Sequence, residues 1–346
     1  MTDVQVLNYT THAIEELTKN IPKIERFMPH SANVYKRIIG LLRQAEKFIL
    51  PNCCDLFDPD ELKQSHMDLF HLPYPICVFE APWIKEEAPS IASVGGLPTA
   101  ISTKRIALCW EAKPGLEIIP GLFNILDRFE QGGAFIVPIF WTVNGGWQIS
   151  SGGTFVPYDN TIRRLSMDEY IADDKILPAS KAAAEKLRKN GQVKEVSSHI
   201  FAEPFMLLPE ACEAMRNKIG EDNVFQQIIL DCHDEVSMAT QACAILNCEN
   251  IGTTKIEAVD KLNKKRIKAE REPFYSYRVL QITEKTKNSS SSGHSGSHNS
   301  PRMHLRRGHI RRLPDRVVWV RATMINASSE EGRVDKDYNI KPRGNK

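Results

Sequence analysis

The first fifty residues carry apolar positions that repeat with the period of an α-helix. Before Pro29 these positions are Ile14, Leu17, Ile21 and Ile24. After Pro29 they are Val34, Ile38, Leu41, Leu42, Ala45 and Phe48. Spacings of three and four residues place each set on one helix face, and Pro51 is expected to end the second helix. The pattern predicts a helical hairpin that packs on the segments after it.

Residues 72–150 have the pattern of β-strands instead. Three apolar, partly β-branched runs have strand length, at 76–80, 105–111 and 134–141. Gly145-Gly146 predicts a hairpin turn before a further strand at 147–149. Residues 89–99 are rich in Gly, Pro and Ser and are expected to form a surface loop. The sequence therefore predicts an antiparallel or mixed sheet.

The chain becomes helical again in its second half. Residues 181–189 combine alanine, lysine and glutamate and precede Gly191, which is typical of a helix and its end. Residues 211–219 and 225–246 repeat apolar side chains at helical spacing. The broad apolar stripe of the second segment comprises Ile228, Ile229, Cys232, Val236, Ala239, Cys243 and Leu246. Such a stripe predicts burial in the core rather than a binding site.

The C-terminal residues predict a small module of one helix and three strands. A basic amphipathic helix is expected over 256–271 and a strand over 275–283. Residues 285–300 are mostly Ser, Gly and Asn, which bury too little apolar area to fold, so a disordered loop is expected. Apolar and polar residues then alternate on both sides of Pro314-Asp315-Arg316, which predicts a β-hairpin. Gly308 indicates a bulge in its first strand.

Together these elements predict an α+β protein. The expected regions are 1–70 (helical), 71–160 (mainly β), 161–254 (mainly helical) and 255–346, the basic α+β module. With 346 residues, 42% of them apolar, the chain can bury a substantial core, and its length favours two or three domains. It shows no bilayer-length apolar stretch and no N-terminal signal pattern, so a cytoplasmic protein without a membrane partner is expected.

The net charge of +2 hides an asymmetry along the chain. Residues 1–254 contain 23 basic and 33 acidic side chains, whereas residues 255–321 contain 17 basic and 6 acidic ones. Two interpretations follow from this difference. The basic segment docks on the acidic body, or it faces solvent and meets a polyanion.

Arginine dominates the predicted hairpin. Seven arginines lie between residues 302 and 321, opposed by a single acid, Asp315. A guanidinium keeps its charge and donates in a fixed fork that suits phosphate, and a two-stranded ribbon fits the major groove of DNA. The residues predicted to contact nucleic acid are Lys264, Lys265, Arg266, Arg306, Arg307, His309, Arg311, Arg312 and Trp319. The alternatives are that the arginines bind acidic side chains of a host or phage protein, or that they form a solvated outer face.

A weaker pattern concerns metal-dependent hydrolysis. Glu80 ends one predicted strand, and Glu111-Ala112-Lys113 ends the next. Some nucleases use this acid-x-lysine spacing, with the carboxylate on Mg²⁺ and the lysine beside a nucleophilic water. Strands that end in Glu are common by chance, and no third carboxylate is fixed by position. Strand-end acids that face solvent are therefore the simpler interpretation, and an enzyme is not the favoured one.

Cysteine and histidine predict no metal or cofactor site. The eight cysteines form no regular framework, so reduced and mostly buried thiols are expected. The intervals between Cys232-His233, Cys243 and Cys248 do not match the short paired spacings of structural zinc sites. The sequence also lacks a phosphate-binding loop, a dinucleotide-binding glycine pattern, a Gly-x-Ser-x-Gly elbow and His-Glu-x-x-His.

Six C-terminal runs share a pattern with known proteins, at residues 262–266, 275–280, 300–302, 304–311, 319–320 and 336–338. Together these runs resemble a family of uncharacterised bacteriophage and prophage proteins. The family carries a histidine, arginine, glycine, histidine strand and then a tryptophan-valine strand, and a looser match covers residues 72–75 and 104–107. After Trp319 the chain departs from the proline-containing, less polar run of the family, which leaves the end of that strand open. The resemblance implies a phage context in a host-cell cytoplasm and supplies no catalytic residue.

Overall fold

The computed structural model describes residues 6–85, 94–97, 101–113, 115–248, 250–282, 303–306, 309–313, 317–320, 323–325 and 333–334. A nine-stranded mixed sheet lies at its centre, in the order β10-β11-β1-β2-β3-β4-β6-β9, with β5 paired to β4. The strands of this sheet are β1 (Glu46–Ile49), β2 (Ile76–Pro82), β3 (Ser102–Glu111), β4 (Gly133–Thr142), β5 (Gly146–Ile149), β6 (Gly152–Pro157), β9 (Glu203–Met206), β10 (Ile251–Ile256) and β11 (Tyr277–Ile282). Helices and a mixed sheet together confirm the α+β class.

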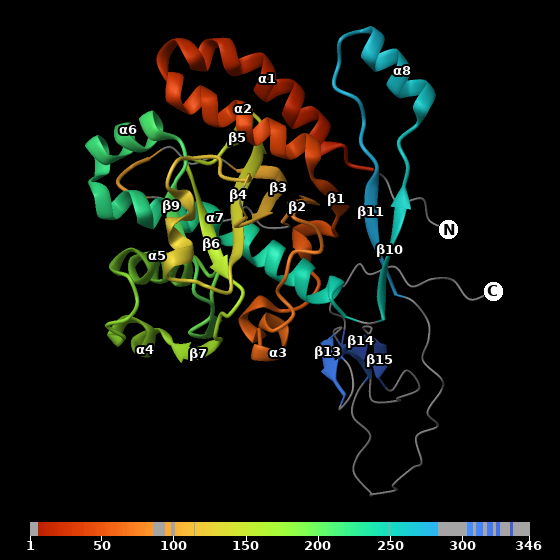
Figure 1. The fold of residues 1–346 in the computed structure, drawn as a ribbon. Helices are drawn as coiled ribbons and strands as arrows, with labels where there is room; N and C mark the ends of the chain where they lie inside the picture. Colours follow the sequence, from red (N-terminus) through yellow and green to blue (C-terminus); the bar gives the residue numbers. More distant parts are fainter. Residues whose placement is uncertain are drawn as a thin grey trace, which may run out of the picture.

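Helices cover both faces of the sheet (Figure 1). The α-helices of the described residues are α1 (Tyr9–Phe27), α2 (Pro29–Gln44), α3 (Gln64–Met67), α4 (Met167–Ala172), α5 (Pro178–Lys189), α6 (Pro209–Ile219), α7 (Glu221–Leu246) and α8 (Asp260–Lys268). The short helices η1 (Asn52–Cys54), η2 (Pro59–Glu61) and η3 (Leu122–Asp127) lie in the connections. Among the described helices, none has an apolar stretch long enough to cross a bilayer.

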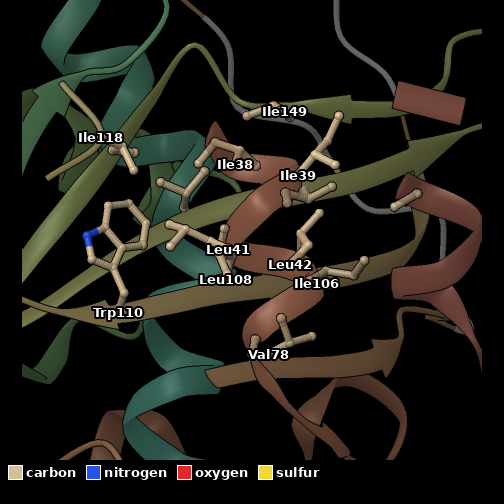
Figure 2. Packing of buried hydrophobic residues seen from close by; sticks show 14 of the residues in the cluster. Ile38, Ile39, Leu41, Leu42, Val78, Ile106, Leu108, Trp110, Ile118 and Ile149 are labelled. Carbon is tan, nitrogen blue, oxygen red and sulfur yellow. The ribbon is translucent and has the colours of Figure 1, made fainter. Parts of the chain in front are cut away.

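The α1–α2 hairpin packs on one face of the sheet, as its apolar pattern predicts. Figure 2 shows Leu41 and Leu42 of α2 against Leu108 and Ile106 of β3, with Val78 of β2 beside them. The side chains between these positions turn the other way, because successive residues of a strand alternate between its faces. The two faces together explain why the central strands are apolar along their whole length.

The opposite face is covered by α7, the 26-residue helix whose apolar stripe predicted burial. Phe79, Ala107 and Cys109 of the sheet belong to the same buried cluster as Ile228 and Cys232 of α7. Of the eight cysteines, seven are buried and Cys53 is partly buried, which confirms the interpretation as buried thiols. Most of the stripe is therefore core, and Ile229 and Leu246 are partly buried.

The second N-terminal helix ends earlier than the sequence predicts. Helix α2 stops at Gln44, and Glu46–Ile49 form β1, which runs parallel to β2 on one side and to β11 on the other. Phe48 is 1% exposed there. A short apolar run fits a helix or a strand equally well. Its pairing with two strands distant in the sequence decides the outcome.

The sheet draws strands from all four regions that the sequence separates. It takes β1 from residues 1–70, β2 to β6 from 71–160, β9 from 161–254 and β11 from 255–346, and β10 crosses the last boundary. Strands from all four regions thus share one sheet, so the boundaries at 70, 160 and 254 run through this sheet. Local composition marks elements but does not show which of them pair.

The C-terminal hairpin is present with a different first strand. Strands β13 (His309–Arg312) and β14 (Val317–Val320) pair antiparallel, with Ile310 opposite Trp319. Strand β12 (Met303–Arg306) pairs instead with β15 (Thr323–Ile325) and β16 (Arg333–Val334). The predicted helix over 256–271 is shorter, because β10 ends at Ile256 and α8 begins at Asp260. The predicted loop at 285–300 lies outside the described residues.

Candidate nucleic-acid interface

Helix α8 carries a group of basic residues that are open to solvent. Figure 1 shows it at the upper end of the ribbon formed by β10 and β11, beside the body rather than within it. Its exposed lysines are Lys261, Lys264, Lys265 and Lys268. In the part of the chain that the structure describes, none of these four lysines forms an ion pair. The predicted contacts Lys264 and Lys265 thus lie on a free cationic surface.

Arg266 has a different environment from the lysines around it. Its side chain is 7% exposed, and its guanidinium donates to Glu15 Oε1 at 2.7 Å and to the carbonyl of Glu272 at 2.7 Å. The ring of Phe274 lies 4.0 Å from the guanidinium carbon. The sequence predicts that Arg266 contacts nucleic acid. In the structure its guanidinium pairs with Glu15 and holds α8 on helix α1.

Other arginines of the basic segment also pair with the acidic body. Arg271 donates to Glu15 at 3.1 Å, and Arg278 donates to Glu46 at 2.9 Å. The two interpretations of the charge asymmetry therefore apply to different residues. Arginines at 266, 271 and 278 neutralise acids of the body, whereas the lysines of α8 remain available to an outside anion.

The β13–β14 hairpin lies near the lower end of the same ribbon (Figure 1). Strand β13 contacts α3, and Val317 packs on the small apolar cluster that contains Phe57 and Ile245. Arg311 is exposed. The whole of Arg307 and the side chains of Arg306, His309, Arg312 and Trp319 lie outside the described residues. The structure thus supports the strand pairing and one exposed arginine of this predicted surface.

Glu80 and Glu111, the two carboxylates of the nuclease hypothesis, do not lie close together in the structure. In the antiparallel pairing of β2 and β3, Glu80 lies opposite Ile106, and Glu111 is five residues further along β3. An odd interval puts the two carboxylates on opposite faces of the sheet, about 17 Å apart along the strand. Glu111 pairs with Lys113 beside it. One metal ion cannot bind both glutamates.

Glu80 serves as a cap for helix α1. Its carboxylate accepts the backbone N–H groups of Tyr9 at 3.0 Å and Thr10 at 2.7 Å. It also accepts the hydroxyl of Tyr277 at 2.7 Å, and it is fully buried. Burial raises the pKa of this carboxyl, while the hydrogen bonds oppose the shift. Asn8, which precedes α1, gives no side-chain cap of its own.

A buried charge cluster beneath Trp83 is absent from the sequence predictions. Arg105 of β3 donates to Glu235 at 3.0 Å and pairs with Asp234 at 3.1 Å, both on α7. Its guanidinium carbon lies 5.0 Å from the ring of Trp83. Burial raises the pKa of Glu235 to about 7, against the lowering effect of Arg105. The signal available in the sequence was a set of acids three and four residues apart, at 231, 234 and 235, within a helix whose apolar stripe predicts burial.

Glu80 with Glu111, and the acids around Arg105, are the two groups of side chains that could be compared with a metal or catalytic site. Neither group has the arrangement of such a site. Among the residues that the structure describes, no three His, Cys, Asp or Glu side chains are grouped to hold a metal ion. The acids around Arg105 act as partners of its guanidinium.

In comparison with known proteins, the chain matches no family model, no curated protein and no solved structure. The resemblance to phage proteins stays a prediction.

Proposed function

We propose that this protein binds nucleic acid through the basic surface of α8, with the β13–β14 hairpin as a second contact. The observation that supports this most is the set of four exposed lysines at 261, 264, 265 and 268, which form no ion pair with any described residue. Arg266 and Glu15 fix the helix that carries them. Positive charge held on a fixed helix attracts a phosphate backbone, whatever its base sequence.

The position of the hairpin is compatible with this proposal. Both basic elements lie along the β10–β11 ribbon, one near each end (Figure 1). Six paired residues span about 20 Å of that ribbon, which is a distance that a nucleic-acid backbone readily covers. The resemblance to phage proteins would place this activity in the cytoplasm of a host cell.

Fluorescence anisotropy with labelled duplex DNA, single-stranded DNA and RNA tests the proposal. A variant with glutamine at Lys261, Lys264, Lys265 and Lys268 is expected to bind at least about tenfold more weakly. The matched control places glutamine at four exposed lysines of the body, Lys19, Lys23, Lys175 and Lys189. Equal weakening in both variants, or no binding by the unchanged protein at low salt, would contradict the proposal.

A protein partner with acidic side chains is the second candidate. Val259, Leu262 and Ile267 on or beside α8 are 63%, 43% and 61% exposed, and phosphates make no use of such apolar side chains. Changing Leu262 and Ile267 to glutamine separates the candidates. Nucleic-acid binding should persist in this variant, whereas binding to a protein partner should fall, because apolar residues supply most of the affinity of protein interfaces.

A further inference from the structure

A cavity of about 340 Å³ lies between α7, helix α5 and the hairpin of β7 (Arg163–Ser166) and β8 (Val196–His199). In Figure 1, α4, α5 and β7 lie at the left and lower left, away from α8 at the upper right. The volume is at the small end of known ligand pockets, which span roughly 300 to 1,000 Å³. It is larger than the gaps that close packing ordinarily leaves in a protein interior.

Small and large apolar side chains line the cavity. Helix α5 faces it with Ala184, which is 8% exposed, where a larger residue would fill the space. The apolar part of the wall comes from both sides, with Leu165 and Leu187 on one and Ile229 and Val236 on the other. An apolar compound would therefore lose its contact with water on entering.

Polar groups converge on the same cavity. Ser197 and the Nε2 atom of His199 are 3.1 Å apart, and the ring of His199 stacks on Tyr170 at 4.1 Å with an angle of 23° between the rings. The imidazole of His233 also lines the cavity, and it has no hydrogen-bond partner among the described residues. His233 is partly buried, so a ligand in the cavity that hydrogen-bonds to its ring would take the place of solvent there.

These polar groups are uncharged at neutral pH. Burial lowers the pKa of His199 to about 4, with Arg163 adding to the effect, and burial also lowers the pKa of His233. Burial raises the pKa of Tyr170 to about 12. Each group can therefore donate or accept a hydrogen bond without presenting a charge to the ligand.

Two of the three acidic and basic residues that line the cavity are already paired, Arg163 with Asp173 and Asp60 with Lys194. The third, Lys175, forms no ion pair with a described residue, but it is exposed to solvent, which screens its charge. An ionised ligand would thus enter an apolar space without a free counter-charge in its interior, which is unfavourable.

We propose that this cavity binds a small neutral heteroaromatic compound with a fused ring system. Its apolar walls match the ring faces, the His199–Tyr170 pair offers an aromatic surface, and His233 can donate to or accept from a ring nitrogen. A compound with no charge meets the neutral polar groups without a desolvated ion. This site is separate from α8 and does not depend on the nucleic-acid proposal.

Isothermal titration calorimetry at pH 7.5 with indole and benzimidazole tests the inference. Both probes are neutral, and indole-2-carboxylate and benzamidine serve as anionic and cationic probes. Ala184→Phe fills the cavity and should abolish binding, whereas Ala172→Phe makes the same change at an exposed position of α4 outside it. His233→Leu keeps the space, removes the free imidazole and should weaken benzimidazole about tenfold.

The outcomes separate clearly. Binding of the neutral probes to the unchanged protein and to Ala172→Phe, with loss in Ala184→Phe, supports the site. If Ala184→Phe does not fold, the tenfold weakening by His233→Leu carries the same conclusion. No binding of either neutral probe, equal binding by His233→Leu and the unchanged protein, or charged probes that bind as well as neutral ones would overturn it.

Discussion

The carboxylate of Glu80 accepts the first backbone N–H groups of α1 and the hydroxyl of Tyr277 in a site that is closed to water. Glu210 holds the start of α2 in the same way, through the N–H groups of His30 and Ser31 at 2.7 and 2.9 Å. Both helices of the N-terminal hairpin thus depend on a glutamate from a distant part of the chain. Local capping signals in the sequence cannot show such a partner.

Replacing Glu80 with alanine is expected to lower the free energy of unfolding by about 3 kcal/mol, because three buried donors lose their acceptor. Glu80→Gln should cost less, since the amide oxygen can still accept. Glu210→Ala, at a more exposed cap, should cost about 1 kcal/mol. Urea unfolding measures all three. Unchanged stability in Glu80→Ala would contradict the capping role.

His66 gives a prediction about acid stability. Burial lowers its pKa to about 4, with Lys63 as a smaller cause, whereas the unfolded chain has the ordinary value near 6.5. The stability from its neutral form is therefore complete above pH 6.5 and is lost as the pH falls toward 4. Across this pH window, the free energy of unfolding of His66→Gln should fall by up to about 3 kcal/mol less than that of the unchanged protein. Parallel curves of unfolding free energy against pH would contradict this.

At the scale of elements, strands and helices with one clear period were predictable. The strands at 76–80 and 134–141 and the helices at 211–219 and 225–246 correspond to β2, β4, α6 and α7. The sequence could not place β1, because Phe48 continues a helical spacing and only its two parallel neighbours make it a strand. For the same reason, the sequence could not show that Glu80 and Glu111 lie on opposite faces of the sheet. This arrangement follows from the register between β2 and β3.

The contact between β3 and α7 through Arg105 is testable at this scale. Arg105→Leu leaves the carboxylates of Glu235 and Asp234 without their cation, and breaking a buried pair costs about 3 to 5 kcal/mol. The pKa of Glu235 is raised to about 7, so the protonated form is favoured in the fold below that pH. The loss of unfolding free energy in Arg105→Leu should therefore be smaller at pH 5 than at pH 8. Equal losses at both pH values in urea unfolding would contradict the account.

At the scale of the whole molecule, the charge asymmetry has a structural outcome that the sequence left open. Arginines of the C-terminal segment pair with Glu15 and Glu46 of the acidic body, and the lysines of α8 do not. Composition could predict an attraction between the two parts. It could not separate the residues that pair with acids of the body from those left for a partner, because that depends on which side chains α8, the segment after it and β11 bring against α1 and β1.

The salt dependence of nucleic-acid binding tests the central claim most directly. Each lysine that neutralises a phosphate contributes about 0.9 to the slope of log K against log salt concentration for duplex DNA. The variant with glutamine at the four lysines of α8 should therefore show a slope shallower by about 3 to 4 than the unchanged protein. The body control should keep the original slope. A slope that α8 does not change, in a protein that still binds, would show that the phosphates lie elsewhere.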